Sequence, residues 1–278
     1  MGEVEIRRMC PHCRAFITTR DKVCPYCNER VGPRAIDRDE SQGGFIGGFI
    51  PHARFNTMMI MLINFGLYIA TSVYSMKAGR GDAMSLDAQT LVDFGAKWTP
   101  YIRLGGQWWR LVTAGFLHGG LLHIAMNSWV LFDLGAQVEE VYGASRMLVI
   151  YFISSVGGFY VSSLWAAGPS VGASAALFGL IGAMIAMGIK HRSTLGDHVK
   201  SLYIRWAIYG LLFGLLPGID NAAHIGGLTF GFLVAWVAGL PRSPESPVER
   251  VWQVASWLCI LITVFCFLKM YLWLSQTA

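Results

Sequence analysis

The chain has 278 residues, of which 54% are hydrophobic and 14% charged, and its formal net charge at pH 7 is +5. Soluble domains carry about 25% charged residues, so this composition excludes a soluble protein with a polar surface. The Lys and Arg residues are scattered over loops, which argues against nucleic-acid binding as a main role. The 32 glycines suit helices that pack closely in lipid. The sequence therefore predicts an all-α polytopic membrane protein in a lipid bilayer.

The first 40 residues form a small polar module. It contains four cysteines in two pairs, Cys10-x2-Cys13 and Cys24-x2-Cys27, separated by ten residues. Two such pairs present four thiolates to one tetrahedral zinc ion. Metal would supply most of the folding energy of a module with so few apolar residues. We predict a structural zinc site in a zinc-ribbon-like module over residues 1–40. A pair of disulfides is the alternative, and His12 could replace one cysteine.

Seven apolar stretches follow a Gly-rich linker over residues 41–54. A spanning helix needs about 20 mostly apolar residues. The stretches are Phe55–Met76, Leu121–Val138, Met147–Ala167, Gly172–Ile189, Ser201–Leu216, Asn221–Leu240 and Val251–Leu274. We assign residues 55–240 to a six-helix core and residues 241–278 to a linker and a seventh transmembrane helix.

Loop charges predict the orientation of these helices. Positive residues are retained on the cytoplasmic side, and long loops count weakly in this rule. With a cytoplasmic N-terminus, the inner loops hold Arg146, Lys190, Arg192, Lys200, Arg242 and Arg250. The short outer loops over residues 168–171 and 217–220 hold no Lys or Arg. The N-terminus is therefore expected inside and the C-terminus outside.

Two spanning stretches each carry one reactive polar residue near their outer ends. Ser174 is expected about one turn inside the fourth stretch, and His224 about one turn inside the sixth. Gly227 and Gly231 lie three and seven residues after His224, on the same helix face. Because the fourth stretch is also rich in glycine, the two helices can approach closely. We predict that Ser174 and His224 lie within hydrogen-bond reach, although a membrane serine often only bonds its own helix.

The second stretch carries two further polar groups at the same expected depth. His123 and Asn127 are spaced i,i+4 and share one helix face, which must point into the bundle. A serine hydroxyl becomes nucleophilic when an adjacent base takes its proton, as neutral His224 can. The oxyanion formed by attack on a carbonyl needs fixed donors, which His123, Asn127 and the Ser174 amide could supply.

The combined motifs resemble the rhomboid protease family. Its nucleophile motif G-x-S-x stands at Gly172–Ala175, its A-H-x-x-G-x-x-x-G motif at Ala223–Gly231, and its H-x-x-x-N motif at His123–Asn127. The family's Trp-Arg pair, its loop histidine and its glutamate in the second helix match Trp109-Arg110, His118 and Glu139. The resemblance covers residues 55–240, whereas the seventh helix and the cysteine module lie outside it.

The resemblance implies a serine endopeptidase with a Ser174–His224 dyad, no third carboxylate and no cofactor for catalysis. It also implies an oxyanion hole from His123, Asn127 and the Ser174 amide, and a water-filled cavity that opens to the outer face. The substrates would be single-pass transmembrane proteins, and the location a bacterial inner membrane. The aromatic residue that stacks on the histidine, often tyrosine in the family, is Phe178 here.

Two other functions remain open from the sequence. The first is a non-catalytic relative that binds membrane helices, although the chain retains both the serine and the histidine. The second is a transporter or metal-handling protein that uses His118, His123 and His224. Against it, no internal repeat typical of transporters is visible. Asp220, four residues before His224, is predicted to cap its helix and not to act as a catalytic acid. The cysteine module is expected to regulate the protein or to recruit substrate.

Overall fold

The computed structural model describes residues 7–10, 12–18, 21–29, 31, 54–82, 84–191, 193–241 and 246–277. The chain divides into two compact units, Met1–Phe49 and Ile50–Ala278. The predicted linker over residues 41–54 falls outside the described residues except for Arg54, as do the loop charges Arg192 and Arg242.

The N-terminal unit contains a two-stranded antiparallel sheet of β1 (Arg7–Met9) and β2 (Phe16–Thr18), with Arg8 opposite Ile17. Each cysteine pair forms the same turn. The amide of Cys10 donates to the carbonyl of Ala15, and the amide of Cys24 donates in the same way to Glu29. Among the described residues of this unit, the buried side chains that form a cluster are Cys10, Ile17, Cys24 and Val31.

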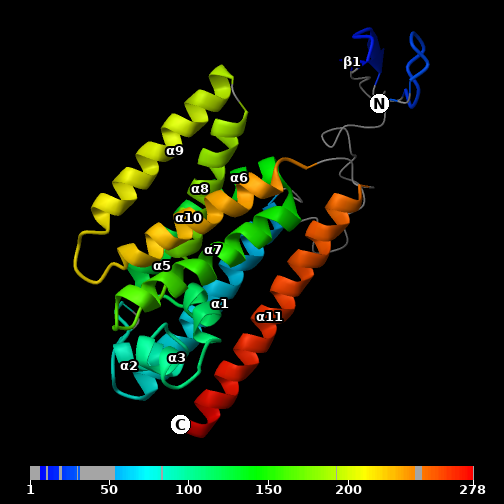
Figure 1. The fold of residues 1–278 in the computed structure, drawn as a ribbon. Helices are drawn as coiled ribbons and strands as arrows, with labels where there is room; N and C mark the ends of the chain where they lie inside the picture. The colour runs from blue at the N-terminus through cyan, green and yellow to red at the C-terminus, as the bar shows by residue number, and fades with distance from the viewer. Residues whose placement is uncertain are drawn as a thin grey trace, which may run out of the picture. The chain divides into compact units, whose positions relative to one another are not determined.

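The regular elements of the second unit that the structure describes are helices joined by turns and loops, with two isolated β-bridges (Figure 1). Its helices are α1 (Phe55–Lys77), α2 (Ala88–Asp93), α3 (Thr99–Arg103), α4 (Arg110–Thr113), η4 (Ala114–Phe116), α5 (Leu121–Val130), η5 (Leu131–Gly135), α6 (Ala136–Tyr142), α7 (Ala144–Trp165), α8 (Ser174–Lys190), α9 (Thr194–Phe213), α10 (Asn221–Ala238) and α11 (Pro247–Thr277). Among these, α1, α7, α10 and α11 are long and apolar enough to cross a membrane, and α8 is apolar but shorter.

The helices differ from the prediction in three ways that bear on the site. Helix α9 begins at Thr194, seven residues earlier than its apolar stretch, because Ser193 caps it by accepting from the Gly196 amide. Because the first turns of α9 contain charged residues, the hydropathy of the sequence does not indicate that the helix starts here. The second spanning segment contains a π-helical turn, η5, between α5 and α6. Helix α8 begins at Ser174 itself. The serine therefore occupies the first helical position and does not lie one turn inside.

Helix α8 forms the centre of the bundle. Twelve of its residues are buried, and it packs against α7, α9 and α10. Helix α10 packs extensively on both α7 and α8. Figure 1 shows α9 at one edge of the bundle and α11 at the other, where α11 contacts α7 and α4. The best-packed part of the fold is thus the α7–α8–α10 group, which carries Ser174 and His224.

Candidate active site and metal centre

Ser174 and His224 lie in direct contact. Ser174 is the first residue of α8, and His224 lies in the first turn of α10. The Oγ atom of Ser174 lies 2.9 Å from Nε2 of His224. The imidazole is buried, with 6% of the residue exposed. A hydroxyl and an imidazole at this distance have the geometry of a nucleophile and its base.

Glycines bring the two helix backbones together. A Cβ atom added at Gly227 would lie 2.0 Å from the carbonyl oxygen of Ala175, and one at Gly231 would lie 2.1 Å from that of Gly179. Carbon and oxygen atoms cannot approach so closely, so no side chain fits at either position. The placement of Ser174 beside His224 therefore depends on two residues that lack a side chain.

Helix α7 completes this packing in a way that the sequence analysis did not identify. A Cβ atom at Gly158 of α7 would lie 2.6 Å from the carbonyl oxygen of Ala223. The sequence pattern that could have indicated this contact is the adjacent pair Gly157-Gly158 within an apolar stretch. Helix α10 is thus held by backbone approach from two sides, immediately before the residue that carries the imidazole.

Phe178 covers one face of the imidazole. Its ring lies parallel to that of His224, with ring centroids 4.3 Å apart and an interplanar angle of 14°. Its other contact is with α9, where a Cβ atom at Gly210 would lie 2.6 Å from Cζ of Phe178. The Phe178 ring therefore fixes the plane of the imidazole. It extends from α8 and packs against Gly210 of α9.

His123 and Asn127 of α5 face the segment that leads into α8. Gly172 has a φ of +130°, a conformation that side chains rarely adopt. A Cβ atom there would lie 2.7 Å from Nε2 of His123 and 3.6 Å from Nδ2 of Asn127. Glycine is required at this position both for its backbone angle and for the approach of these two side chains.

Hydrogen bonds define which atoms of His123 and Asn127 can donate. The amide of Gly119 donates to Nδ1 of His123 at 3.3 Å, so a neutral imidazole carries its proton on Nε2. Nδ2 of Asn127 is buried and has no hydrogen-bond partner among the described residues. Buried donors are nearly always paired, so an unpaired one indicates a ligand or a reacting group. Nε2–H of His123 and Nδ2 of Asn127 are thus two hydrogen-bond donors near Gly172, just before the start of α8.

His118 is buried next to His123. It is 1% exposed, and its ring centroid lies 5.1 Å from that of His123. The structure therefore places His118 against His123, with no described contact to Ser174 or His224.

Arg110 organises the outer segment between α1 and α5. It is fully buried, and its Nη1 donates to the carbonyl oxygens of Val92 at 2.6 Å and Ala96 at 3.2 Å. Its guanidinium also lies 4.6 Å from the centre of the Trp109 ring. Burial lowers the pKa of Arg110 to about 10, so it remains a cation at neutral pH. The Trp109-Arg110 pair therefore holds this segment together.

Glu139 of α6 also has a structural role, because it binds the first turn of α1. Its carboxylate accepts from the backbone amides of Asn56 at 3.0 Å and Thr57 at 3.1 Å. It also accepts from the Thr57 hydroxyl at 2.8 Å. First-turn amides have no intrahelical partner, and a carboxylate there also favours the helix dipole. Glu139 thus joins α6 to the N-terminus of α1.

Lys97, which the sequence analysis did not single out, tethers the segment before Ser174. Its Nζ donates to the carbonyl oxygens of Ala166 at 2.7 Å and Gly168 at 3.2 Å. Its backbone also forms an antiparallel bridge with Ser170. No local pattern indicates such a contact, because the partners are about 70 residues away in sequence and accept through their backbone.

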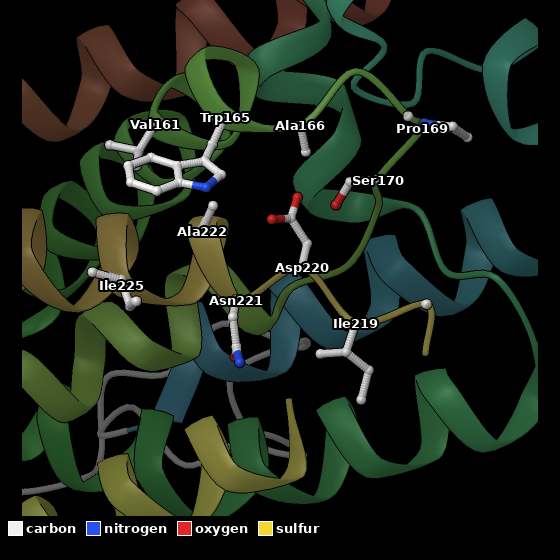
Figure 2. Close-up of a pocket in the computed structure, with 12 residues that line it drawn as sticks. Val161, Trp165, Ala166, Pro169, Ser170, Ile219, Asp220, Asn221, Ala222 and Ile225 are labelled. Carbon is white, nitrogen blue, oxygen red and sulfur yellow. The ribbon is translucent and has the colours of Figure 1, made fainter. Parts of the chain in front are cut away.

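A groove of about 640 Å³ lies beside the site (Figure 2). Its walls come from the end of α7, the following segment and the start of α10, including Trp165, Asp220 and Ile225. Neither Ser174 nor His224 lines it. Asp220 accepts from the Ala223 amide at 3.0 Å and from the Ser162 hydroxyl. It caps α10 as predicted from the sequence.

The four cysteines of the N-terminal unit converge. Their Sγ atoms all lie within 4.8 Å of one another, with 3.7 Å between Cys10 and Cys27 and 3.6 Å between Cys13 and Cys24. These separations far exceed the disulfide bond length of about 2.05 Å, and all four thiols are free. Four sulfurs at about 2.3 Å from a zinc ion lie about 3.8 Å apart. The described cysteines therefore fit a tetrahedral zinc ion better than a pair of disulfides.

Comparison with known proteins identifies one matching domain. Residues 105–241 match the family model described as Rhomboid domain. The matched region includes Trp109, His123, Asn127, Ser174 and His224 and ends in the segment after α10. It does not include the cysteine module or α11.

Individual relatives agree with this match. The Rhomboid protease GluP of Bacillus subtilis is 37% identical over 178 residues, which cover 64% of this chain and 35% of the relative. RHOMBOID-like protein 6, mitochondrial, of Arabidopsis thaliana is 38% identical over 169 residues, covering 59% and 53%. Inactive RHOMBOID-like protein 8 of the same plant is 38% identical over 122 residues, covering 43% and 35%. The chain spans about a third to a half of the length of these relatives.

Proposed function

Because the chain carries a rhomboid domain over residues 105–241, we propose that it is an intramembrane serine endopeptidase with Ser174 as nucleophile and His224 as base. The domain and the apolar helices make it an integral, multi-pass membrane protein. The observation that carries the proposal is the 2.9 Å contact between Oγ of Ser174 and Nε2 of His224. The name of the Bacillus subtilis relative, which includes the word protease, supports it.

The first half of the reaction forms an acyl-enzyme. Oγ of Ser174 attacks the carbonyl carbon of the scissile peptide bond, and its proton moves to Nε2 of His224. The carbonyl oxygen becomes an oxyanion, for which Nδ2 of Asn127, Nε2–H of His123 and the Ser174 amide are the donors. The C–N bond then breaks, and His224 returns the proton to the leaving amine.

The second half of the reaction releases the acyl group. A water molecule attacks the ester carbon, its proton moves to Nε2 of His224, and its oxygen forms the new bond to carbon. The ester bond to Ser174 breaks as His224 gives the proton back to Oγ. The products are a carboxylate fragment and the free serine, and no cofactor takes part. The buried, unpaired Nδ2 of Asn127 supports its role as a donor, because it requires a partner.

The substrates are single-pass transmembrane proteins, and cleavage takes place near the outer face of the membrane. The N-terminus lies in the cytoplasm and the C-terminus outside, and the membrane is a bacterial inner membrane. The loop charges retained on one side of the spanning segments support this orientation.

The test compares cleavage of a model single-pass substrate by full-length wild type and Ser174→Ala in proteoliposomes. Ser174→Ala and His224→Ala should each reduce kcat by about 10³-fold or more. Ser275→Ala is the matched control, because the Ser275 hydroxyl only bonds the Leu272 carbonyl of its own helix. Cleavage by Ser174→Ala at the wild-type rate would exclude Ser174 as nucleophile.

A non-catalytic membrane-helix binding protein is the second candidate, because one of the relatives is named inactive. A fluorophosphonate probe, which reacts with activated serines, separates the two functions without a known substrate. The protease is expected to be labelled at Ser174, with labelling lost in His224→Ala. Co-purification of a membrane helix with an unlabelled wild type would favour the binding protein.

For the N-terminal unit, the proposal is a structural zinc ion bound by Cys10, Cys13, Cys24 and Cys27. The ion would supply folding energy to a unit with so few apolar residues. Elemental analysis of the full chain should find one zinc per molecule and none in Cys13→Ser/Cys27→Ser. Zinc retained in that double variant would exclude this ligand set.

The N-terminal unit is also expected to affect substrate recruitment. Cleavage rates of the same double variant, in cells and in detergent, would measure this effect.

A further inference from the structure

Asn221 occupies a position that the sequence analysis did not consider. It is the first residue of α10 and lies three positions before His224, so both side chains lie on the same face of the first turn. Figure 2 shows the Asn221 amide pointing away from the carboxylate of the preceding residue, Asp220. Asp220 caps the helix backbone, which leaves the Asn221 side chain free for other contacts.

The Asn221 amide makes two hydrogen bonds with different partners. Its Nδ2 donates to the carbonyl oxygen of Leu211, in α9, at 3.1 Å. Its Oδ1 lies 3.2 Å from Nδ1 of His224. A carbonyl oxygen can only accept, so the NH₂ group of Asn221 must face Leu211. Its oxygen therefore faces His224, and this orientation follows from the chemistry of the partners.

The hydrogen bond with Asn221 also fixes the position of the proton on the imidazole. Oδ1 of Asn221 can only accept, so Nδ1 of His224 must be the donor. A neutral imidazole carries one proton, and Nε2 is then an acceptor. Nε2 is the atom that lies 2.9 Å from Oγ of Ser174. The hydrogen bonds thus run from Ser174 through His224 and Asn221 to Leu211.

Close packing against α9 locks the amide in place. A Cβ atom added at Gly214, which follows α9, would lie 1.9 Å from Oδ1 of Asn221. Even the smallest side chain at Gly214 would displace the amide from His224. The end of α9 is therefore shaped to admit the Asn221 side chain, and it also supplies the Leu211 carbonyl that orients it.

We infer that Asn221 is a positioning residue that holds His224 as the Nδ1–H tautomer and so keeps Nε2 available as the base for Ser174. The inference rests on the proposed protease function. Among the described residues, Asn221 has no hydrogen bond to the Ser174 hydroxyl, and its role is exerted through His224. The chain thus has an amide in the place where many serine hydrolases have a carboxylate, and Asp220 points elsewhere.

The inference predicts different effects for two substitutions. Asn221→Leu keeps a similar volume but leaves Nδ1–H of a buried imidazole without an acceptor. Asn221→Asp keeps the acceptor and adds a negative charge, which favours the imidazolium form of His224. The carboxylate lacks the donor for Leu211. Loss of the acceptor should therefore lower kcat, whereas the added charge should move the pH dependence.

The main experiment measures kcat, KM and the pH profile of full-length variants in proteoliposomes. Asn221→Leu should lower kcat about 10- to 100-fold with little change in KM, since it removes an interaction on which only the chemical step depends. Asn221→Asp should shift the acid limb of the kcat profile upward by about one pH unit. Thr229→Val is the control on the same helix, because the Thr229 hydroxyl only bonds the Ile225 carbonyl.

A direct measurement covers the case in which a variant fails to fold. The ¹⁵N NMR spectrum of histidine-labelled wild type, with His224 assigned by its absence in His224→Asn, should show a protonated Nδ1 and an unprotonated Nε2. A proton on Nε2 of wild-type His224 would overturn the inference. So would a kcat for folded Asn221→Leu within twofold of wild type together with an unshifted acid limb for Asn221→Asp.

Failure of the inference is distinguishable from failure of the proposed function. Equal cleavage by wild type and Ser174→Ala would reject the protease, whereas the NMR measurement would still test the contact between Asn221 and His224. If Ser174→Ala is inactive but Asn221→Leu retains full activity, only the positioning role of Asn221 is rejected.

Discussion

The two helices that flank α8 contact it in different ways. Helix α10 approaches the α8 backbone so closely that no side chain fits at Gly227 or Gly231. Helix α9 faces outward along most of its length, and only Gly196, Tyr203 and Ala207 of it are buried. At the site, Gly210 and the Leu211 carbonyl of α9 contact side chains of the other two helices, Phe178 of α8 and Asn221 of α10.

This difference separates two requirements of the proposed chemistry. Backbone contact fixes the distance between Ser174 and His224, because neither helix can shift without breaking the packing of the other. The contacts of α9 with the Phe178 and Asn221 side chains affect only the plane and the tautomer of the imidazole. Substitutions at the α8–α10 contact should therefore affect stability and activity together, whereas substitutions at Gly210 or on the outward face of α9 should affect activity alone or neither.

Gly227→Ala should have the largest effect. The new Cβ atom would lie 2.0 Å from the Ala175 carbonyl oxygen, so α8 and α10 must separate. Such overpacking costs about 1–3 kcal/mol. We expect a clearly lower Tm in detergent and loss of most cleavage. Gly66→Ala is the matched control, because a Cβ atom there meets nothing within 4 Å. A normal Tm and normal activity for Gly227→Ala would contradict the importance of this contact.

Lys97→Met should have the next largest effect, because it removes the tether of the segment that leads into Ser174. The substitution removes the charged donor of two carbonyl oxygens, those of Ala166 and Gly168, and only Ala166 keeps another donor, the Thr99 hydroxyl. Loss of a hydrogen bond to a charged group costs about 1.5–3 kcal/mol. Both Tm and kcat should fall, and KM should change little. The exposed Lys77 provides the matched control, Lys77→Met. Equal Tm values for the two variants would show that the tether is dispensable.

Gly210→Ala tests the α9 side with the same substitution as in α10. Its Cβ atom would lie 2.6 Å from the end of the Phe178 ring, not from backbone. The ring must shift, and its stack on His224, now at 4.3 Å between centroids, is disturbed. Aromatic stacking contributes about 0.5–1.5 kcal/mol. We expect a several-fold lower kcat with a small change in Tm. A loss of Tm as large as in Gly227→Ala would remove the distinction between the two flanks.

Tyr209→Leu should have the smallest effect. Tyr209 lies on the outward face of α9 and is 61% exposed. Surface substitutions of this kind usually change stability by less than about 0.5 kcal/mol. Thermal unfolding and cleavage rates should both match wild type. A marked loss of activity at normal Tm would show that the outward face of α9 contributes to the reaction, for example by contacting the substrate.

Several features could be predicted from the sequence because they depend on local composition and spacing. The long apolar stretches predicted the spanning helices, and the all-α membrane fold is confirmed by the helices and the matched domain. The spacing of His224, Gly227 and Gly231 predicted a packed helix face, and Asp220 was correctly predicted as a cap. The catalytic roles of Ser174 and His224 remain predictions, although the structure brings the two side chains together.

Other features required the tertiary structure. The sequence placed Ser174 inside its helix, whereas α8 begins at this residue, because only the packing of the preceding segment decides where the helix starts. The bonds of Lys97 and Asn221 run to backbone carbonyls of distant segments, which carry no side-chain signal. The spacing of three residues between Asn221 and His224 was visible, but its meaning depended on α9.

The amino-acid sequence alone thus predicted a helical membrane protein, the cysteines that form a cluster and the polar groups on the helix faces that meet. Hydrophobicity and helical periodicity are properties of neighbouring residues, and they can be read without a fold. Only the tertiary structure decided which atom of His224 faces Ser174. That choice depends on hydrogen bonds among α8, α9 and α10, and these bonds exist only when the three helices are packed together.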